Sequence, residues 1–246
     1  QVLSGRTGYD EGHIPSAGFA DLLVALADGA SPLRFALPSP QQFAAEMEAL
    51  GVGDESRVVL YSATDPGWAA RVWWMLRWIG FDRAALLDGG IQAWKAEGRP
   101  LSTEPARRPE GRLTVSPRPA LIADRDEVRA AIGDEKVTLV DALPESSYRG
   151  QVAFYGRPGH IAGAINVPSS ALVDESGRYL PPEELAKRHG GVHDGRVITY
   201  CGGGIAASSS AFVLTRLGYE NVAVYTASLQ EWAPDPANPM EVGPTE

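Results

Sequence analysis

One cysteine is the residue of this sequence whose surroundings best suit covalent chemistry. Cys201 is the single cysteine among 246 residues and directly follows an apolar stretch at residues 197–200. Three glycines come next, and a helical pattern begins at about Ala206. A thiolate is a strong nucleophile. Successive glycines can adopt positive φ angles and direct backbone N–H groups toward one point, where the dipole of a following helix also favours negative charge. The segment therefore predicts a nucleophilic thiolate in a cradle of N–H donors.

A buried structural cysteine and a glycine-rich phosphate loop are two other interpretations of this segment. A lone cysteine in a tight turn is often a buried structural residue. A position at the carboxyl end of a strand, where open α/β sheets usually carry their sites, favours a functional thiol instead. A glycine-rich phosphate or dinucleotide loop is disfavoured, because the spacing fits neither GxxxxGK[ST] nor GxGxxG.

The elements that must position this thiol occur in two copies. Several segments recur in the same order, too far apart for a solenoid repeat, which indicates tandem domains. The matched segments are 12–17 with 159–164, 57–61 with 196–200, and Trp94 with Trp232.

Apolar strands alternate with helices in each copy, which predicts an α/β fold with a mainly parallel sheet flanked by helices. Strands are expected at 58–61, 84–87, 120–122, 137–140, 197–200 and 222–225, and helices at about 68–79, 124–132 and 206–217. Asp124, followed three residues later by Glu127, predicts a capping box at the start of the second of these helices.

These elements imply domains at 1–104 and 120–246, joined by a proline-rich extended linker at 105–119. The first copy has far fewer residues before its Gly-His-Ile motif than the second. It is therefore expected to lack an opening strand and helix and to begin near the end of a strand at Val2 and Leu3.

Composition excludes several classes of partner. The chain has 22 basic and 31 acidic side chains, a net charge of −9, which disfavours nucleic acid because binding to phosphate backbones depends on clustered cations. No apolar run approaches the roughly 20 residues that a membrane helix requires, so no membrane partner is expected. A single cysteine excludes an internal disulfide and a thiolate metal cluster and predicts a cytoplasmic location.

The sequence resembles the tandem-domain rhodaneses, the thiosulfate and 3-mercaptopyruvate sulfurtransferases. The resemblance rests on the Gly-His-Ile motifs at Gly12 and Gly159, the six-residue loop that starts at Cys201, and residues 87–94, which close the first copy. It implies two rhodanese-like domains with an active second domain. It also implies ping-pong transfer of sulfur from thiosulfate or 3-mercaptopyruvate, through a Cys201 persulfide, to cyanide or a thiol. No metal or organic cofactor is implied, and a thioredoxin-like reductant is a possible partner.

The resemblance also indicates which residues form the site. Cys201 is the catalytic residue, and Ser62 at the matching place makes the first copy non-catalytic. Arg149 and Arg157 lie where the family carries arginines that bind the donor, although two solvated surface arginines are an equal alternative. The remaining residues expected to bind substrate are Gly202, Gly203, Gly204, Ile205 and Ala206.

Departures from the family pattern leave other functions open. Leu143 replaces a usual arginine after Asp141, and Ala206 replaces a usual threonine, serine or arginine, so activity could be weak or the donor unusual. A persulfide carrier that loads but does not turn over is one alternative, and a protein-binding rhodanese module is another. A related phosphatase is disfavoured, because Ala206 and Ala207 stand where a Cys-x5-Arg loop needs its arginine. His13 and His160 are expected to serve the fold, since both copies keep them and only one keeps a thiol.

Overall fold

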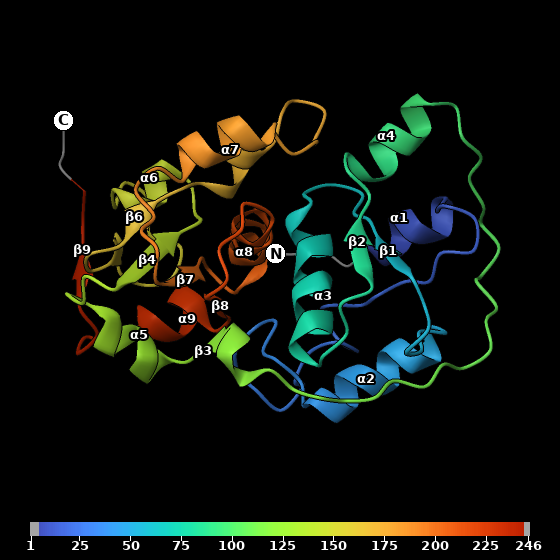
Figure 1. Ribbon diagram of the computed structural model, residues 1–246, viewed down its shortest axis with the longest axis horizontal. Helices are drawn as coiled ribbons and strands as arrows, with labels where there is room; N and C mark the ends of the chain where they lie inside the picture. The colour runs from blue at the N-terminus through green and yellow to red at the C-terminus, as the bar shows by residue number, and fades with distance from the viewer. Residues whose placement is uncertain (1–4, 244–246) are drawn as a thin grey trace. The chain divides into compact units, whose positions relative to one another are not determined.

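The computed structural model describes residues 5–243, which divide into two compact units (Figure 1). The first unit extends to Arg118 and includes Glu175–Arg178, and the second comprises Pro119–Asp174 and the chain from Tyr179 onward. Val2 and Leu3, expected at the end of a strand, lie outside the described residues. Between residues 5 and 243, no helix combines the length and the apolar character needed to cross a membrane.

A five-stranded parallel sheet, in the order β3-β8-β7-β4-β6, forms the centre of the second unit. Its central strands are almost entirely buried, as continuous apolar strands of parallel sheets generally are. The strands are β3 (Ile122–Ala123), β4 (Val137–Asp141), β6 (Ile165–Asn166), β7 (Arg196–Tyr200) and β8 (Val222–Tyr225). The predicted α/β fold with a mainly parallel sheet is confirmed.

Helices cover both faces of this sheet (Figure 1). Leu139, Ile198 and Ala223 are neighbours in register and share a buried cluster with residues of α5 (Arg125–Ala131) and α9 (Ser228–Trp232). On the alternate side, the Thr199 hydroxyl donates to the carbonyl of Ala207 in α8 (Ile205–Arg216) at 3.0 Å. Strand residues alternate between faces, so α5 and α9 cover one face and α8 covers the other.

The remaining elements of this unit connect and close the sheet. β5 (His160–Ile161) pairs antiparallel with β9 (Met240–Glu241), which ties the C-terminal segment to the Gly-His-Ile motif. The other elements are η1 (Pro119–Leu121), α6 (Glu145–Tyr148), η2 (Ser169–Leu172) and α7 (Pro182–Arg188).

The first unit contains a smaller version of the same plan. β1 (Val58–Leu60) and β2 (Ala84–Leu86) pair in parallel, and α3 (Gly67–Trp78) packs against both strands. Ten of the twelve residues of α3 are buried, so this helix forms the centre of the unit's core. The other helices are α1 (Arg6–Glu11), α2 (Pro40–Ala49) and α4 (Gly90–Ala96).

The duplication extends to individual contacts around the Gly-His-Ile motif. His13 stacks on Tyr9 with ring centroids 3.9 Å apart, and its Nδ1 lies 2.8 Å from the Tyr9 carbonyl. His160 stacks on Tyr148 at 3.6 Å, with the same 2.8 Å contact to the carbonyl. Both histidines are buried. These contacts confirm that the two histidines serve the fold.

A tyrosine at the end of a strand, Tyr61 directly after β1 and Tyr200 as the last residue of β7, binds the backbone of each motif. The backbone N–H of Ile14 donates to the Tyr61 hydroxyl at 3.2 Å, and that of Ile161 donates to the Tyr200 hydroxyl at 3.0 Å. In both units, therefore, a tyrosine hydroxyl accepts from the backbone N–H that follows the histidine of the motif.

Residues 105–118 of the extended linker expected at 105–119 contain neither helix nor strand and are attached to the first unit, whereas Pro119 begins a 3₁₀ turn. The Leu113 N–H donates to a carboxylate oxygen of Glu48 at 2.6 Å, and the Leu113 side chain is buried. Arg118 donates to both carboxylate oxygens of Asp82 at 2.7 and 2.6 Å. Proline-rich composition indicated the extended backbone, whereas these contacts depend on residues far away in sequence.

Most predicted elements lie within a residue or two of the observed ones, and one boundary is wrong. Residues 120–122 were expected as a strand, but Pro119–Leu121 form a 3₁₀ turn and the strand begins at Ile122. Proline fixes φ near the helical value and suits the first position of such a turn. The predicted capping box is half confirmed: Asp124 accepts from the Glu127 N–H at 2.8 Å, whereas the Glu127 carboxylate accepts from Arg196 Nε at 2.9 Å.

Candidate active site

Cys201 lies where β7 ends and the turn into α8 begins. The residue is 3% exposed, and its Sγ accepts a hydrogen bond from the Gly204 N–H at 3.1 Å. Gly204 caps the N-terminus of α8, so the sulfur also lies at the positive end of a twelve-residue helix. A sulfur in this position receives a backbone donor and a favourable dipole, both of which stabilise an anionic form.

Only one of the three glycines after Cys201 has a positive φ angle, although the sequence allowed it for all three. Gly204 has φ +87°, and neither Gly202 nor Gly203 has a positive φ. Gly202 is required for a different reason. A Cβ on Gly202 would stand 1.7 Å from the hydroxyl oxygen of Tyr155. The first glycine therefore provides room for a neighbouring side chain, and the third provides the turn.

Ser228 holds the cysteine backbone from the neighbouring strand end. The Cys201 N–H donates to Ser228 Oγ at 3.1 Å, and that hydroxyl donates to the Tyr225 carbonyl at 2.7 Å. Ser228 is fully buried and has φ +55°, a conformation that favours glycine. Gly90 has the same φ at the matching place in the first unit. Sequence analysis missed Ser228, although the match between residues 87–94 and the segment after β8 could have indicated it.

The loop opens to the surface through three of its residues. Gly203, Ile205 and Ala206 are partly exposed, whereas Cys201, Gly202 and Gly204 are buried. The partly exposed residues and the sulfur all belong to the loop at residues 201–206, which leads from β7 into α8. A small molecule that reaches Cys201 along this turn would meet backbone and apolar side chains.

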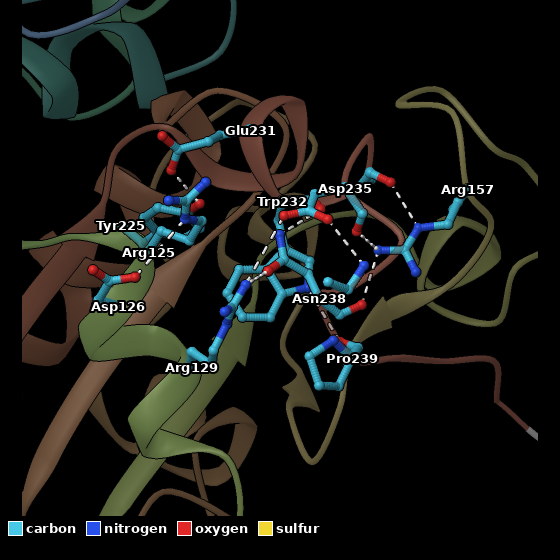
Figure 2. A network of polar contacts seen from close by, with 12 residues as sticks. Arg125, Asp126, Arg129, Arg157, Tyr225, Glu231, Trp232, Asp235, Asn238 and Pro239 are labelled. Carbon is cyan, nitrogen blue, oxygen red and sulfur yellow. Dashed lines mark hydrogen bonds and ion pairs between the residues drawn. The ribbon is translucent and has the colours of Figure 1, made fainter.

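Arg157, expected to bind the donor, donates to backbone carbonyls of the loop that follows α9 (Figure 2). Its Nε donates to the Ala233 carbonyl at 2.6 Å, and its Nη2 donates to the carbonyls of Asp235 and Asn238 at 2.8 and 2.9 Å. Three backbone acceptors thus use these two nitrogens. Binding of a donor by Arg157 remains a prediction, and it would compete with these hydrogen bonds, which anchor the loop that follows α9.

The network around this loop extends to α5. Figure 2 shows Arg129 directed at Asn238, whose side-chain amide donates to the Trp232 carbonyl at 2.9 Å. The Trp232 indole donates to the Pro239 carbonyl at 3.1 Å. The C-terminal loop is therefore held on both sides, by α5 and by Arg157.

Arg149 follows α6 and forms an ion pair with Glu145. The Arg149 Nε and Nη2 lie 3.0 and 2.8 Å from the same carboxylate oxygen, one helical turn earlier. About a quarter of its side chain is exposed. Binding of a donor by Arg149 remains a prediction, and it would compete with this ion pair.

A buried carboxyl group lies beside the cysteine strand. Asp141 is the last residue of β4, in register with Tyr200, and is fully buried. One of its oxygens accepts from the Leu143 N–H at 2.8 Å, and the Tyr200 hydroxyl also faces the group. Burial raises the pKa of Asp141 to about 7, against the smaller opposing effect of these hydrogen bonds.

The family model for the rhodanese-like domain matches this chain twice, at residues 4–97 and 124–235. The two matches correspond to the two copies of the repeat.

Curated relatives align over almost the whole chain. A probable 3-mercaptopyruvate sulfurtransferase of Pseudomonas aeruginosa is 36% identical and covers 97% of this chain and 87% of the relative. A putative thiosulfate sulfurtransferase of Mycobacterium bovis is 35% identical and covers 99% of this chain and 91% of the relative.

Solved structures share the architecture. The 3-mercaptopyruvate sulfurtransferase SseA of Escherichia coli has a TM-score of 0.83 and 33% identity over 91% of this chain and 85% of its own. A variant of EanB in complex with ergothioneine has a TM-score of 0.86 and 25% identity over 98% of this chain, which spans 63% of the EanB chain. With two matched domains and a shared fold, this chain belongs to the rhodanese-like domain family.

Proposed function

We propose that this chain is a sulfurtransferase that moves sulfane sulfur from 3-mercaptopyruvate or thiosulfate to a thiophilic acceptor. The observation that carries the proposal is the position of Cys201, whose sulfur accepts the Gly204 N–H at the N-terminus of α8. The names of the full-length relatives, which are sulfurtransferases for these two donors, support the same activity.

In the first half-reaction the Cys201 thiolate attacks the outer sulfur of the donor. With thiosulfate, the S–S bond of the donor breaks, sulfite leaves with the electron pair, and a new S–S bond to Cys201 forms a persulfide. With 3-mercaptopyruvate, the C–S bond breaks, and the carbon keeps the electron pair and takes up the thiol proton to give pyruvate. Both routes leave the same anionic persulfide on Cys201.

The second half-reaction returns the enzyme to its thiolate form. An acceptor such as cyanide attacks the outer sulfur of the persulfide, which gives thiocyanate and releases the Cys201 thiolate. A small thiol or a thioredoxin-like protein could serve in the same way. A free thiol nucleophile suits a reducing compartment such as the cytoplasm.

The backbone of the loop stabilises charge in both halves of the cycle. Thiolate and persulfide are anions at nearly the same place, and fixed N–H donors stabilise such charge without reorganising. Ser228 supports this by holding the Cys201 N–H, which keeps the peptide at the start of the loop in place. With thiosulfate no proton is transferred, whereas with 3-mercaptopyruvate the thiol proton must reach the carbon.

Steady-state turnover with each donor, together with the intact mass of the donor-treated protein, tests the proposal. Wild-type protein is expected to gain one sulfur and to form thiocyanate repeatedly with cyanide. Cys201→Ser should abolish both, since no other thiol exists in the chain. Ser62→Ala, at the matching place in the first unit, is the control and should keep full activity.

Three results contradict the proposal. Turnover by Cys201→Ser would remove Cys201 as the nucleophile. A mass gain without repeated turnover would make the protein a persulfide carrier, and the absence of both would exclude sulfur transfer from these donors.

A further inference from the structure

An insertion distinguishes the copy that carries the thiol from the copy that does not. The stacked pair Tyr9 and His13 is four residues apart, whereas the equivalent pair Tyr148 and His160 is twelve residues apart. Both pairs make the same stacking contact, so the second copy has eight additional residues between two fixed points. This added segment contains Tyr155.

The added segment is held at both ends and in the middle. A Cβ on Gly150 would meet Val242 at 2.7 Å, and one on Gly159 would meet the Glu241 carbonyl at 2.0 Å, so both ends lie directly against the C-terminal segment. Between them, Arg157 donates to three backbone carbonyls of residues 233–238. The segment therefore holds its side chains in defined places.

One of these side chains lies against the cysteine loop. The Tyr155 hydroxyl occupies the space beside Gly202 in which a side chain at that position would stand. The ring packs against the buried cluster of the second unit, and Phe154, which is 69% exposed, contacts it edge-on. The first copy lacks the insertion and has Ala63 after Ser62, where the second has Gly202 after Cys201. Insertion, glycine and thiol thus occur together in one copy and are absent together from the other.

We propose that Tyr155 is a specificity-determining residue of the Cys201 site. Its ring lies beside Gly202, the residue that follows the buried thiol, and its hydroxyl donates a hydrogen bond to the anionic group of the sulfur donor. This inference rests on the proposed function and deepens it, because it names a side chain outside the loop that recognises the donor. The carboxylate of mercaptopyruvate and the sulfonate oxygens of thiosulfate differ in shape, so a fixed hydroxyl and ring discriminate between them.

Donor kinetics of two substitutions separate the ring from the hydroxyl. Tyr155→Phe keeps the aromatic ring and removes only the hydroxyl. The value of kcat/KM for the preferred sulfur donor should then fall about tenfold, the effect of losing one hydrogen bond to a charged group. Tyr155→Ala removes both and should also change the ratio of kcat/KM between the two donors. Tyr219→Phe is the matched control, because Tyr219 lies beyond the C-terminal end of α8, at the opposite end of the helix from Cys201.

The rate at which iodoacetamide alkylates the single cysteine reports how far Tyr155 restricts access to the thiol, without any sulfur transfer. Tyr155→Ala should react several-fold faster than wild type, and Tyr155→Phe should react at the wild-type rate, because the ring still lies beside Gly202, next to the thiol. If wild type transfers no sulfur, the proposed function fails, while the alkylation rates still report on Tyr155. The inference is overturned if Tyr155→Ala reacts at the wild-type rate, or if Tyr155→Phe keeps the wild-type kcat/KM for both donors.

Discussion

At the scale of single residues, the cysteine strand ends beside two buried polar groups with different roles. Ser228 accepts a hydrogen bond from the Cys201 N–H, and its backbone has a positive φ angle, which is unfavourable for serine. Asp141 is buried at the end of the adjacent strand, where one oxygen accepts from the Leu143 N–H and the Tyr200 hydroxyl is the other polar group that faces the carboxyl. Burial of this kind disfavours the charged carboxylate and favours the protonated form.

The raised pKa of Asp141 predicts a pH dependence of stability. Its pKa is about 7 in the folded protein and near 3.8 in an unfolded chain, so between these values the folded state binds more protons. The free energy of unfolding should therefore fall as pH rises from about 4 to 7, by at most about 1.4 kcal/mol per pH unit from this group. Asp141→Asn should remove this slope, measured by urea unfolding at pH 5 and pH 8.

Asp134→Asn is the control for that measurement, because Asp134 is exposed and accepts from the Lys136 N–H in a turn. It should retain the wild-type slope. A slope unchanged in Asp141→Asn would show that Asp141 is ionised in the folded protein throughout this range.

At the scale of elements, a long loop is ordered by contacts to another loop. The segment between α6 and β5 has no helix or strand of its own. Arg157 connects it to the residues that follow α9, and β5 pairs with β9 just beyond them. Order in this segment therefore depends on tertiary contacts, those of Arg157 among them, more than on local propensity.

Arg157→Ala should loosen this segment specifically. Loss of three charged hydrogen bonds to carbonyls should cost about 1–3 kcal/mol of local stability and leave the backbone of residues 150–158 open to exchange. Hydrogen–deuterium exchange should show faster exchange there and at residues 233–238. Arg125→Ala, which removes a partly exposed arginine of the same unit, is the control, and equal exchange in the two variants would refute the anchor.

At the scale of the whole molecule, two copies of one plan have diverged in what they carry. Both retain the stacked tyrosine and histidine and the tyrosine below them, while one has Cys201 and the other Ser62. Five of the six tryptophans belong to the first unit and the single cysteine belongs to the second. Each unit thus has its own intrinsic probe of unfolding.

These probes test whether residues 105–118 belong to the first unit. Leu113→Ala removes a buried side chain of this segment and should cost about 2–5 kcal/mol. The midpoint of urea unfolding followed by tryptophan fluorescence should fall by more than the midpoint followed by thiol alkylation. Equal shifts of the two midpoints would contradict the assignment of this segment to the first unit.

The sequence by itself determined the features that depend on local pattern. The duplication, the order of strands and helices, the cap at Asp124 and the place of Cys201 after a buried strand all follow from periodicity and spacing within short windows. Tertiary structure decided the partners of long side chains. Arg157 reaches carbonyls 76 to 81 residues away, Tyr155 lies against Gly202, and Ser228 holds the Cys201 N–H from 27 residues away. Local pattern does not report which distant groups a folded chain brings together, and these contacts determine what surrounds the thiol.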